Sequence, residues 1–167
     1  MLNRKLKRLD KEQAFQKLKH YCGYQERSHQ EAREKLYGFG LYKQEVEEIL
    51  SRLIEEDYLN EERFAIAYAG GKFRMKGWGK NKIVQSLKEK RVSDYCIKKA
   101  MQEINVDNYQ ATIDKLASAK WKSLRSEPNI FIRMRKAQDY LLHKGFESNL
   151  VGNAIQKLRK QNADEKE

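Results

Sequence analysis

The stretch that decides the fold is residues 83–104, IVQSLKEKRVSDYCIKKAMQEI, because its apolar pattern occurs three times in the chain. The same pattern occupies residues 32–53 and 137–158, and seven apolar columns align without a gap. The columns are Ala32, Ile83 and Ala137; Leu36, Leu87 and Leu141; Leu41, Val92 and Phe146; Val46, Ile97 and Val151; Ile49, Ala100 and Ala154; Leu50, Met101 and Ile155; and Leu53, Ile104 and Leu158. The last four columns have the i, i+3, i+4, i+7 spacing of an amphipathic helix, so each copy predicts two helices joined by a tight turn.

A further helix precedes each copy, which makes a three-helix repeat. The expected inward faces of these helices are Phe15, Leu18 and Cys22; Phe64, Ala67, Tyr68, Gly71 and Met75; and Ile113, Leu116, Lys120 by its aliphatic stem, and Leu124. We therefore predict an all-α protein of three tandem three-helix repeats in an elongated, curved molecule. The expected boundaries are residues 1–58, 59–106 and 107–160, followed by a frayed tail at 161–167.

Polar residues mark the expected helix starts. Ser28 with Glu31 has the spacing of a capping box, and Asn60, Ser93 and Ser148 are expected to cap later helices. Pro128 suits the first turn of a helix, where a missing amide costs little. Glycines at positions 38, 40 and 145 are expected to end helices.

The composition agrees with helices around small cores. The 167 residues are 35% charged and only 40% hydrophobic, with one proline and a mean hydropathy of −0.93. The two cysteines, Cys22 and Cys96, are far apart and are expected to be reduced thiols. No window is apolar enough for a membrane span or a secretory signal, so we expect a cytoplasmic protein with no membrane partner. We also expect a monomer.

The net charge of +11 is unevenly distributed. Residues 1–58 contribute 12 − 11 = +1, residues 59–106 contribute 11 − 5 = +6, and residues 107–167 contribute 12 − 8 = +4. Such an excess favours a phosphate backbone or an acidic surface as partner. The candidate contacts are Lys72, Arg74, Lys76, Lys80, Lys82, Lys88, Lys90 and Arg91, a second group of Arg133, Arg135, Lys136 and Lys144, and the aromatic Trp78. Trp78 could equally be a packing plug or an exposed contact.

Two segments carry a family resemblance. Residues 57–68, DYLNEERFAIAY, and residues 76–83, KGWGKNKI, resemble the RecX family, with Asn60 where that family usually has aspartate. Both residues cap helices, so the departure changes little. The resemblance implies tandem three-helix repeats, binding in the groove of a RecA–DNA filament, and modulation, usually inhibition, of ATP hydrolysis and strand exchange by RecA.

The residues themselves argue against catalysis. The chain has no GxxxxGK[ST] loop, and His20, His29 and His143 lack metal-ligand spacing, so we expect neither enzyme activity nor a cofactor. Arg63 near a helix start is expected to pair with Asp57 or Glu56. Two other functions stay open: a helical-repeat nucleic-acid binder without RecA dependence, and an adaptor for an acidic protein.

Overall fold

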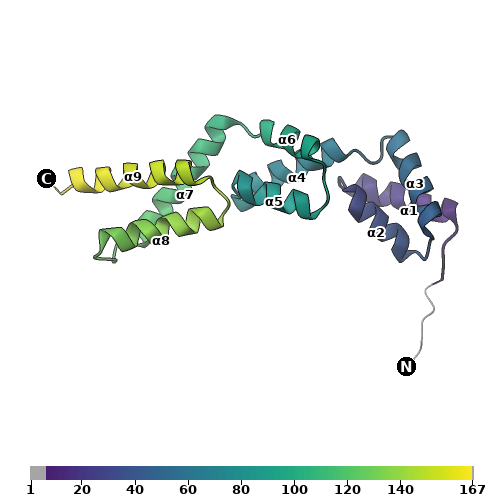
Figure 1. The fold of residues 1–167 in the computed structure, drawn as a ribbon, viewed down its shortest axis with the longest axis horizontal. Helices are drawn as coiled ribbons and strands as arrows, with labels where there is room; N and C mark the ends of the chain where they lie inside the picture. Colours follow the sequence, from purple (N-terminus) through teal and green to yellow (C-terminus); the bar gives the residue numbers. More distant parts are fainter. Residues whose placement is uncertain (1–6, 167) are drawn as a thin grey trace, which may run out of the picture. The chain divides into compact units, whose positions relative to one another are not determined.

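The computed structural model describes residues 7–166, and this part of the chain contains nine helices and no strand (Figure 1). The helices are α1 (Lys11–Tyr24), α2 (His29–Gly38), α3 (Lys43–Glu55), α4 (Glu61–Lys76), α5 (Lys80–Glu89), α6 (Asp94–Gln102), α7 (Val106–Ser123), α8 (Ile130–His143) and α9 (Ser148–Asp164). The all-α prediction is confirmed.

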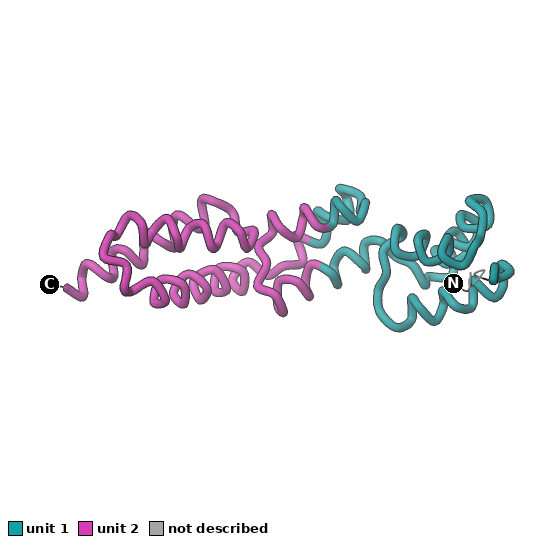
Figure 2. The backbone as a smooth tube through the Cα atoms, turned by 90° about the horizontal axis from the view of Figure 1, so that it is seen from below, with its two compact units in different colours: residues 1–68, 87–100 teal, residues 69–86, 101–167 magenta. Residues whose placement is uncertain are grey.

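The chain forms two compact units (Figure 2). The first comprises the chain up to Tyr68 together with Leu87–Ala100, and the second comprises Ala69–Ser86 together with the chain from Met101 onward. The division passes through α4, α5 and α6, so residues of one helix contribute to different units. The three repeat boundaries and the frayed tail remain predictions, and α9 includes residues 161–164.

The aligned apolar columns form the cores. All of their residues are buried except Met101 and Leu158, which are half-buried. In the first unit the columns from α2 and α3 pack with Phe15, Leu18 and Cys22 of α1 in one cluster. Both cysteines are free and buried, and burial raises the pKa of the Cys22 thiol to about 11. Cys22 therefore packs as a small apolar residue, as its position on the stripe predicts.

The tight turn within each repeat has the same backbone geometry in all three copies. Gly40, Arg91 and Gly145 lie four residues after the aligned leucines, with positive φ angles of 82°, 59° and 97°. Each amide donates to the carbonyl three residues earlier, at 2.9 Å, 2.9 Å and 3.0 Å. The second copy thus places an arginine in a conformation that costs a non-glycine residue about 1–2 kcal/mol.

Three of the four expected caps are confirmed. Ser28 and Glu31 form the reciprocal capping box, and Asn60 and Ser93 accept hydrogen bonds from the amides of the residues three positions later. The prediction for Ser148 is wrong, because Ser148 is the first residue of α9 and Glu147 precedes it without a capping bond. The prediction for Pro128 is also wrong, because Asn129 lies between it and α8 and caps that helix.

The expected inward faces of α4 and α7 are rotated from the observed ones. The buried residues are Phe64, Ala65, Ala69 and Phe73 on α4, and Tyr109, Ile113, Ala117 and Trp121 on α7. Met75 is 83% exposed. On α7 the aromatic residues Tyr109 and Trp121 account for the rotation, because they bury more area than Leu116 and Leu124 of the expected face.

Arg63 has one of its expected partners and one unexpected partner. Its guanidinium contacts Asp57 at 3.2 Å, as predicted, and Glu26 at 2.6 Å. Glu56 pairs with Arg52 instead, at 3.6 Å. Side-chain hydrogen bonding to Glu26 raises the pKa of Arg63, so the arginine joins the end of α1 to the start of α4 as a permanent cation.

Replacing Gly40 by alanine is expected to lower the free energy of unfolding by about 1–2 kcal/mol, because alanine resists the left-handed conformation. A Cβ at Gly40 would lie 3.4 Å from the nearest Arg8 carbons, so the backbone angle is the main cost. Gly38→Ala is the matched control, since it ends α2 and a Cβ there has no atom within 4 Å. Urea unfolding followed by circular dichroism measures the free energy of unfolding of both variants. Equal destabilisation by the two variants would contradict the role of the positive φ at Gly40.

Candidate nucleic-acid interface

The loop Gly77-Trp78-Gly79 joins α4 to α5 in the second unit. Gly77 has a φ of +63°, and its amide donates to the carbonyl of Phe73 at 3.0 Å. The amide of Trp78 donates to the carbonyl of Lys72 at 3.2 Å. Gly77 therefore ends α4 in the left-handed conformation that glycine adopts at little cost.

Gly79 serves a different purpose, namely close backbone contact. Its amide donates to the carbonyl of Lys144 at 2.8 Å, and the amide of Asn81 donates to the carbonyl of Gly145 at 2.9 Å. A Cβ at Gly79 would lie 2.2 Å from the carbonyl carbon of Gly145. The turn between α8 and α9 therefore caps the N-terminus of α5, and only glycine permits the approach.

A lysine side chain from the same turn also contacts the end of α4. Lys144 Nζ donates to the carbonyl of Lys76, the last residue of α4, at 2.8 Å. A cation at a helix C-terminus is favoured by the helix dipole and by the free carbonyl groups there. Lys144 is thus brought to the end of α4 from a distant part of the sequence.

Trp78 lies beneath two ammonium groups. Lys72 Nζ and Lys82 Nζ lie 4.9 Å and 4.7 Å from its ring centroid, and the indole is half-buried. Each such cation–π contact is worth about 0.5–1 kcal/mol at a site open to solvent. The ring is therefore a platform that holds two cations, and its contact with a partner stays a prediction.

Tyr109 supports the start of α5, directly after the glycine loop, and the sequence analysis did not identify it. Its hydroxyl accepts from the amide of Lys80 at 2.9 Å and donates to Glu147 at 2.5 Å. Its ring lies 5.7 Å from Phe73 and 5.5 Å from Phe146. Burial first, and then the bond to Glu147, raise the pKa of Tyr109, so the phenol stays protonated and keeps donating. An aromatic residue one turn before Ile113 was the only sequence signal for it.

These contacts bring together one cluster of cations in the second unit. We call it the Trp78 cluster, and its members are Lys72, Lys76, Trp78, Lys80, Lys82 and Lys144. Lys80 Nζ lies 5.0 Å from the Tyr109 ring centroid. Arg74 is exposed on α4 close to the cluster in sequence. Several partly solvated lysines around an aromatic face suit binding to phosphate groups.

The remaining candidates of the second unit lie outside this cluster. Arg133 is 8% exposed, and its guanidinium donates to the carbonyl of Trp121 at 2.7 Å and 3.2 Å. Arg133 is therefore an internal packing residue and not an available phosphate contact. Lys136 pairs with Glu127 at 3.3 Å, and Arg135 is exposed. Lys136 and Lys144 are eight residues apart, about 12 Å along a helix at 1.5 Å per residue.

Lys88, Lys90 and Arg91 belong to the first unit. Lys90 pairs with Glu31 at 3.2 Å and lies 5.5 Å from the Tyr68 ring centroid. Lys88 and Arg91 are exposed. Lys90 is therefore engaged in holding its own unit together.

The described residues offer neither a metal site nor a membrane segment. Within residues 7–166 no three or more His, Cys, Asp or Glu side chains are grouped closely enough to hold a metal ion. None of the helices in this range combines the length and hydropathy that crossing a bilayer requires.

Comparisons with known proteins find relatives of the chain. The family described as RecX, second three-helix domain, matches residues 60–101, which include α4, the glycine loop and α5. The resemblance to the RecX family is confirmed. The Regulatory protein RecX of Oceanobacillus iheyensis is 27% identical over 139 residues, which is 83% of this chain and 51% of that protein. That of Bacillus velezensis is 26% identical over 160 residues, 95% of this chain and 60% of that protein.

Solved RecX structures share the fold. The crystal structure of RecX from Lactobacillus salivarius matches with a TM-score of 0.80 at 23% identity, over 89% of this chain and 96% of that chain. A second crystal structure of regulatory protein RecX matches with a TM-score of 0.79 at 24% identity, over 88% and 71% of the two chains. The chain spans about half the length of the RecX proteins from Oceanobacillus and Bacillus that it matches.

Replacing Gly79 by alanine is expected to lower the free energy of unfolding by about 2–4 kcal/mol, because the new methyl group meets backbone atoms that cannot move aside. Gly71→Ala is the matched control: it lies within α4, and a Cβ there has no atom within 4 Å. Alanine at position 71 should leave stability unchanged or raise it by about 1 kcal/mol. Chemical denaturation distinguishes the two, and a tolerated Gly79→Ala would refute the close approach.

Proposed function

We propose that the chain is a RecX-type regulator that binds in the groove of the RecA–DNA filament and modulates RecA, with inhibition as the expected sign. It would suppress ATP hydrolysis and strand exchange, and so regulate DNA repair and recombination in the bacterial cytoplasm. The observation that carries the proposal is similarity to proteins named Regulatory protein RecX over 83–95% of the chain.

The Trp78 cluster supports a DNA contact within this function. Lys72 and Lys82 lie over the indole ring, and Lys80 lies over the ring of Tyr109. Lys144 binds the carbonyl of Lys76 at the end of α4. Lysines at such a site would neutralise phosphates and release counterions, without reading the base sequence. Lys88 and Arg91 are further candidate contacts, and Arg135 would add another from α8.

The mechanism requires no chemistry from this chain. A regulator that occupies the groove would hinder strand exchange and filament growth by competition alone, with no cofactor. The absence of a nucleotide-binding loop in the sequence supports a non-enzymatic role. We expect a monomer to be sufficient.

The second candidate is a helical-repeat nucleic-acid binder without RecA dependence. The Trp78 cluster favours it, because lysines around an aromatic ring would bind the backbone of any nucleic acid. The first function depends on contacts with the RecA filament, whereas the second requires only binding to the nucleic acid.

The deciding experiment measures the DNA-dependent ATPase of RecA with less than one copy of this chain per RecA. The salt concentration is set where fluorescence anisotropy no longer detects binding of the chain to the naked oligonucleotide. The proposal predicts a clear fall in ATP hydrolysis under this condition, because filament contacts persist when phosphate contacts alone fail. An unchanged ATPase, with binding to naked DNA retained at low salt, would reject RecA modulation and leave the second candidate.

A further inference from the structure

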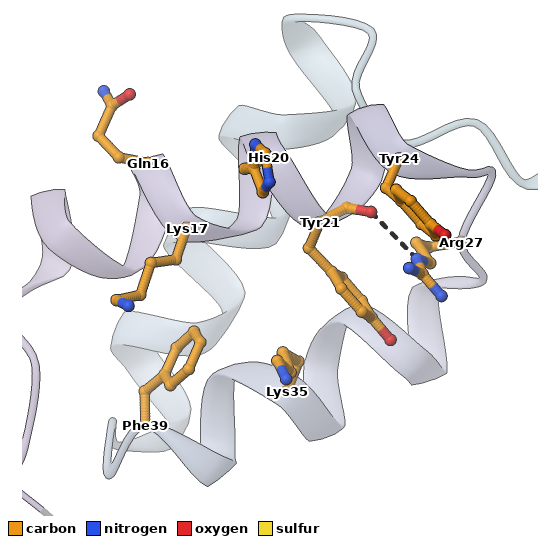
Figure 3. Close-up of a pocket in the computed structure, with 8 residues that line it drawn as sticks. All are labelled: Gln16, Lys17, His20, Tyr21, Tyr24, Arg27, Lys35 and Phe39. Carbon is orange, nitrogen blue, oxygen red and sulfur yellow. Dashed lines mark hydrogen bonds between the residues drawn. The ribbon is translucent and has the colours of Figure 1, made fainter.

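The first unit contains an open groove that the Trp78 cluster does not involve. It has a volume of about 610 Å³ and lies between α1 and α2. Its lining residues are Gln16, Lys17, His20, Tyr21, Tyr24, Arg27, Lys35 and Phe39 (Figure 3). A volume of this size is in the range of sites that bind small molecules or short peptide segments, about 300–1,000 Å³.

The cations of the groove are arranged around aromatic rings. Arg27 lies 3.7 Å from the Tyr21 ring centroid, and its Nε donates to the Tyr21 carbonyl at 3.1 Å. Lys35 of α2 lies 5.3 Å from Tyr21 and 5.9 Å from Phe39. Figure 3 shows Lys17 and Phe39 at one end of the groove, Tyr24 and Arg27 at the other, and Lys35 between them. The positive charges therefore lie along an apolar surface.

These cations are not neutralised inside the groove. No lining residue is acidic, and within residues 7–166 neither Lys17 nor Lys35 forms an ion pair. Tyr24 leaves 82% of its surface exposed, although Phe15 of the same helix is buried. A ligand that fits must bring negative charge and an apolar group together.

The charge of the surrounding surface decides between a nucleic acid and a peptide. The first repeat has a balance of only +1, and α1, α2 and α3 all carry exposed glutamates, among them Glu12, Glu34 and Glu48. A long polyanion gains little from a surface whose charge is nearly balanced, because Glu12 and Glu48 are already paired with Arg52 and Lys11. Arg27 also covers a face of the Tyr21 ring, which removes a stacking surface for bases. A peptide with localised negative charge avoids both difficulties.

We propose that this groove binds a segment of a partner protein in which an aromatic or aliphatic side chain is flanked by carboxylates. The apolar side chain would lie against Tyr24 and Phe39, and the carboxylates would pair with Lys17, Arg27 and Lys35. This inference is independent of the proposed function, because the groove and the Trp78 cluster belong to different units and share no residue.

The test uses the isolated chain and the fluorescein-labelled synthetic peptide Asp-Asp-Trp-Leu-Glu-Asp. Fluorescence anisotropy should show a Kd on the order of 100 μM, because a short flexible peptide loses entropy on binding. Two matched peptides, one with serines for the apolar pair and one with amides for the acids, should bind at least about fivefold more weakly. NMR spectra of the ¹⁵N-labelled chain should show peptide-induced shifts in residues 16–39.

The matched variants locate the site. Tyr24→Ala with Lys35→Glu should weaken peptide binding by about tenfold or more, and both positions are exposed, so the fold is retained. Tyr95→Ala with Lys98→Glu makes the same chemical changes on α6, also at exposed positions, and should leave the affinity unchanged. Circular dichroism confirms that both variants are folded.

Three results would overturn the proposal. The first is that the acidic peptide does not bind. The second is that the peptide-induced shifts are confined to residues 69–86. The third is that an eight-nucleotide oligothymidylate binds residues 16–39 more tightly than the peptide does. The last result would make the groove a nucleic-acid site. None of these measurements contains RecA, so their failure is distinct from failure of the ATPase experiment.

Discussion

The backbone contact between Gly79 and the turn at Lys144 and Gly145 is the constraint on which the basic surface of the second unit depends. Two amide hydrogen bonds, at 2.8 Å and 2.9 Å, fix the glycine loop against that turn, and Lys144 caps α4 from the same place. On α5, Lys82 lies over Trp78 and Lys80 over Tyr109, at 4.7 Å and 5.0 Å from the ring centroids.

The turn that contains Gly145 has counterparts in the other two repeats. Gly40, Arg91 and Gly145 share one backbone conformation, yet each turn is used differently. At Gly145 the turn caps a neighbouring helix, and at Arg91 it presents an arginine at a backbone cost that glycine would avoid. Packing requires only the repeated geometry, so the side chains at the turn are free to vary.

The sequence predicted the features that follow from local periodicity and capping. The columns from Leu36, Leu87 and Leu141 identified the cores, and the pattern of Ser28 and Glu31 identified a helix start. The sequence-based prediction failed where packing between residues distant in the sequence decides which face of a helix is buried. The aromatic residues Tyr109 and Trp121 turned α7 away from its expected face, and Arg133 became internal because the Trp121 carbonyl receives its guanidinium. The groove beside Tyr24 was also missed, because its cations are averaged out in the nearly neutral charge of the first repeat.

The central claim is that the Trp78 cluster binds phosphates within the RecA–DNA filament. The most direct measurement is the salt dependence of filament affinity for the chain and for its Lys76→Gln, Lys80→Gln, Lys82→Gln variant. The magnitude of the slope of log affinity against log salt should fall by about 2, at roughly 0.7 for each single-strand phosphate that the variant no longer neutralises. The variant Lys43→Gln, Lys98→Gln, Lys99→Gln removes the same charge from the first unit and should keep the original slope. Equal slopes for the chain and both variants would contradict the claim.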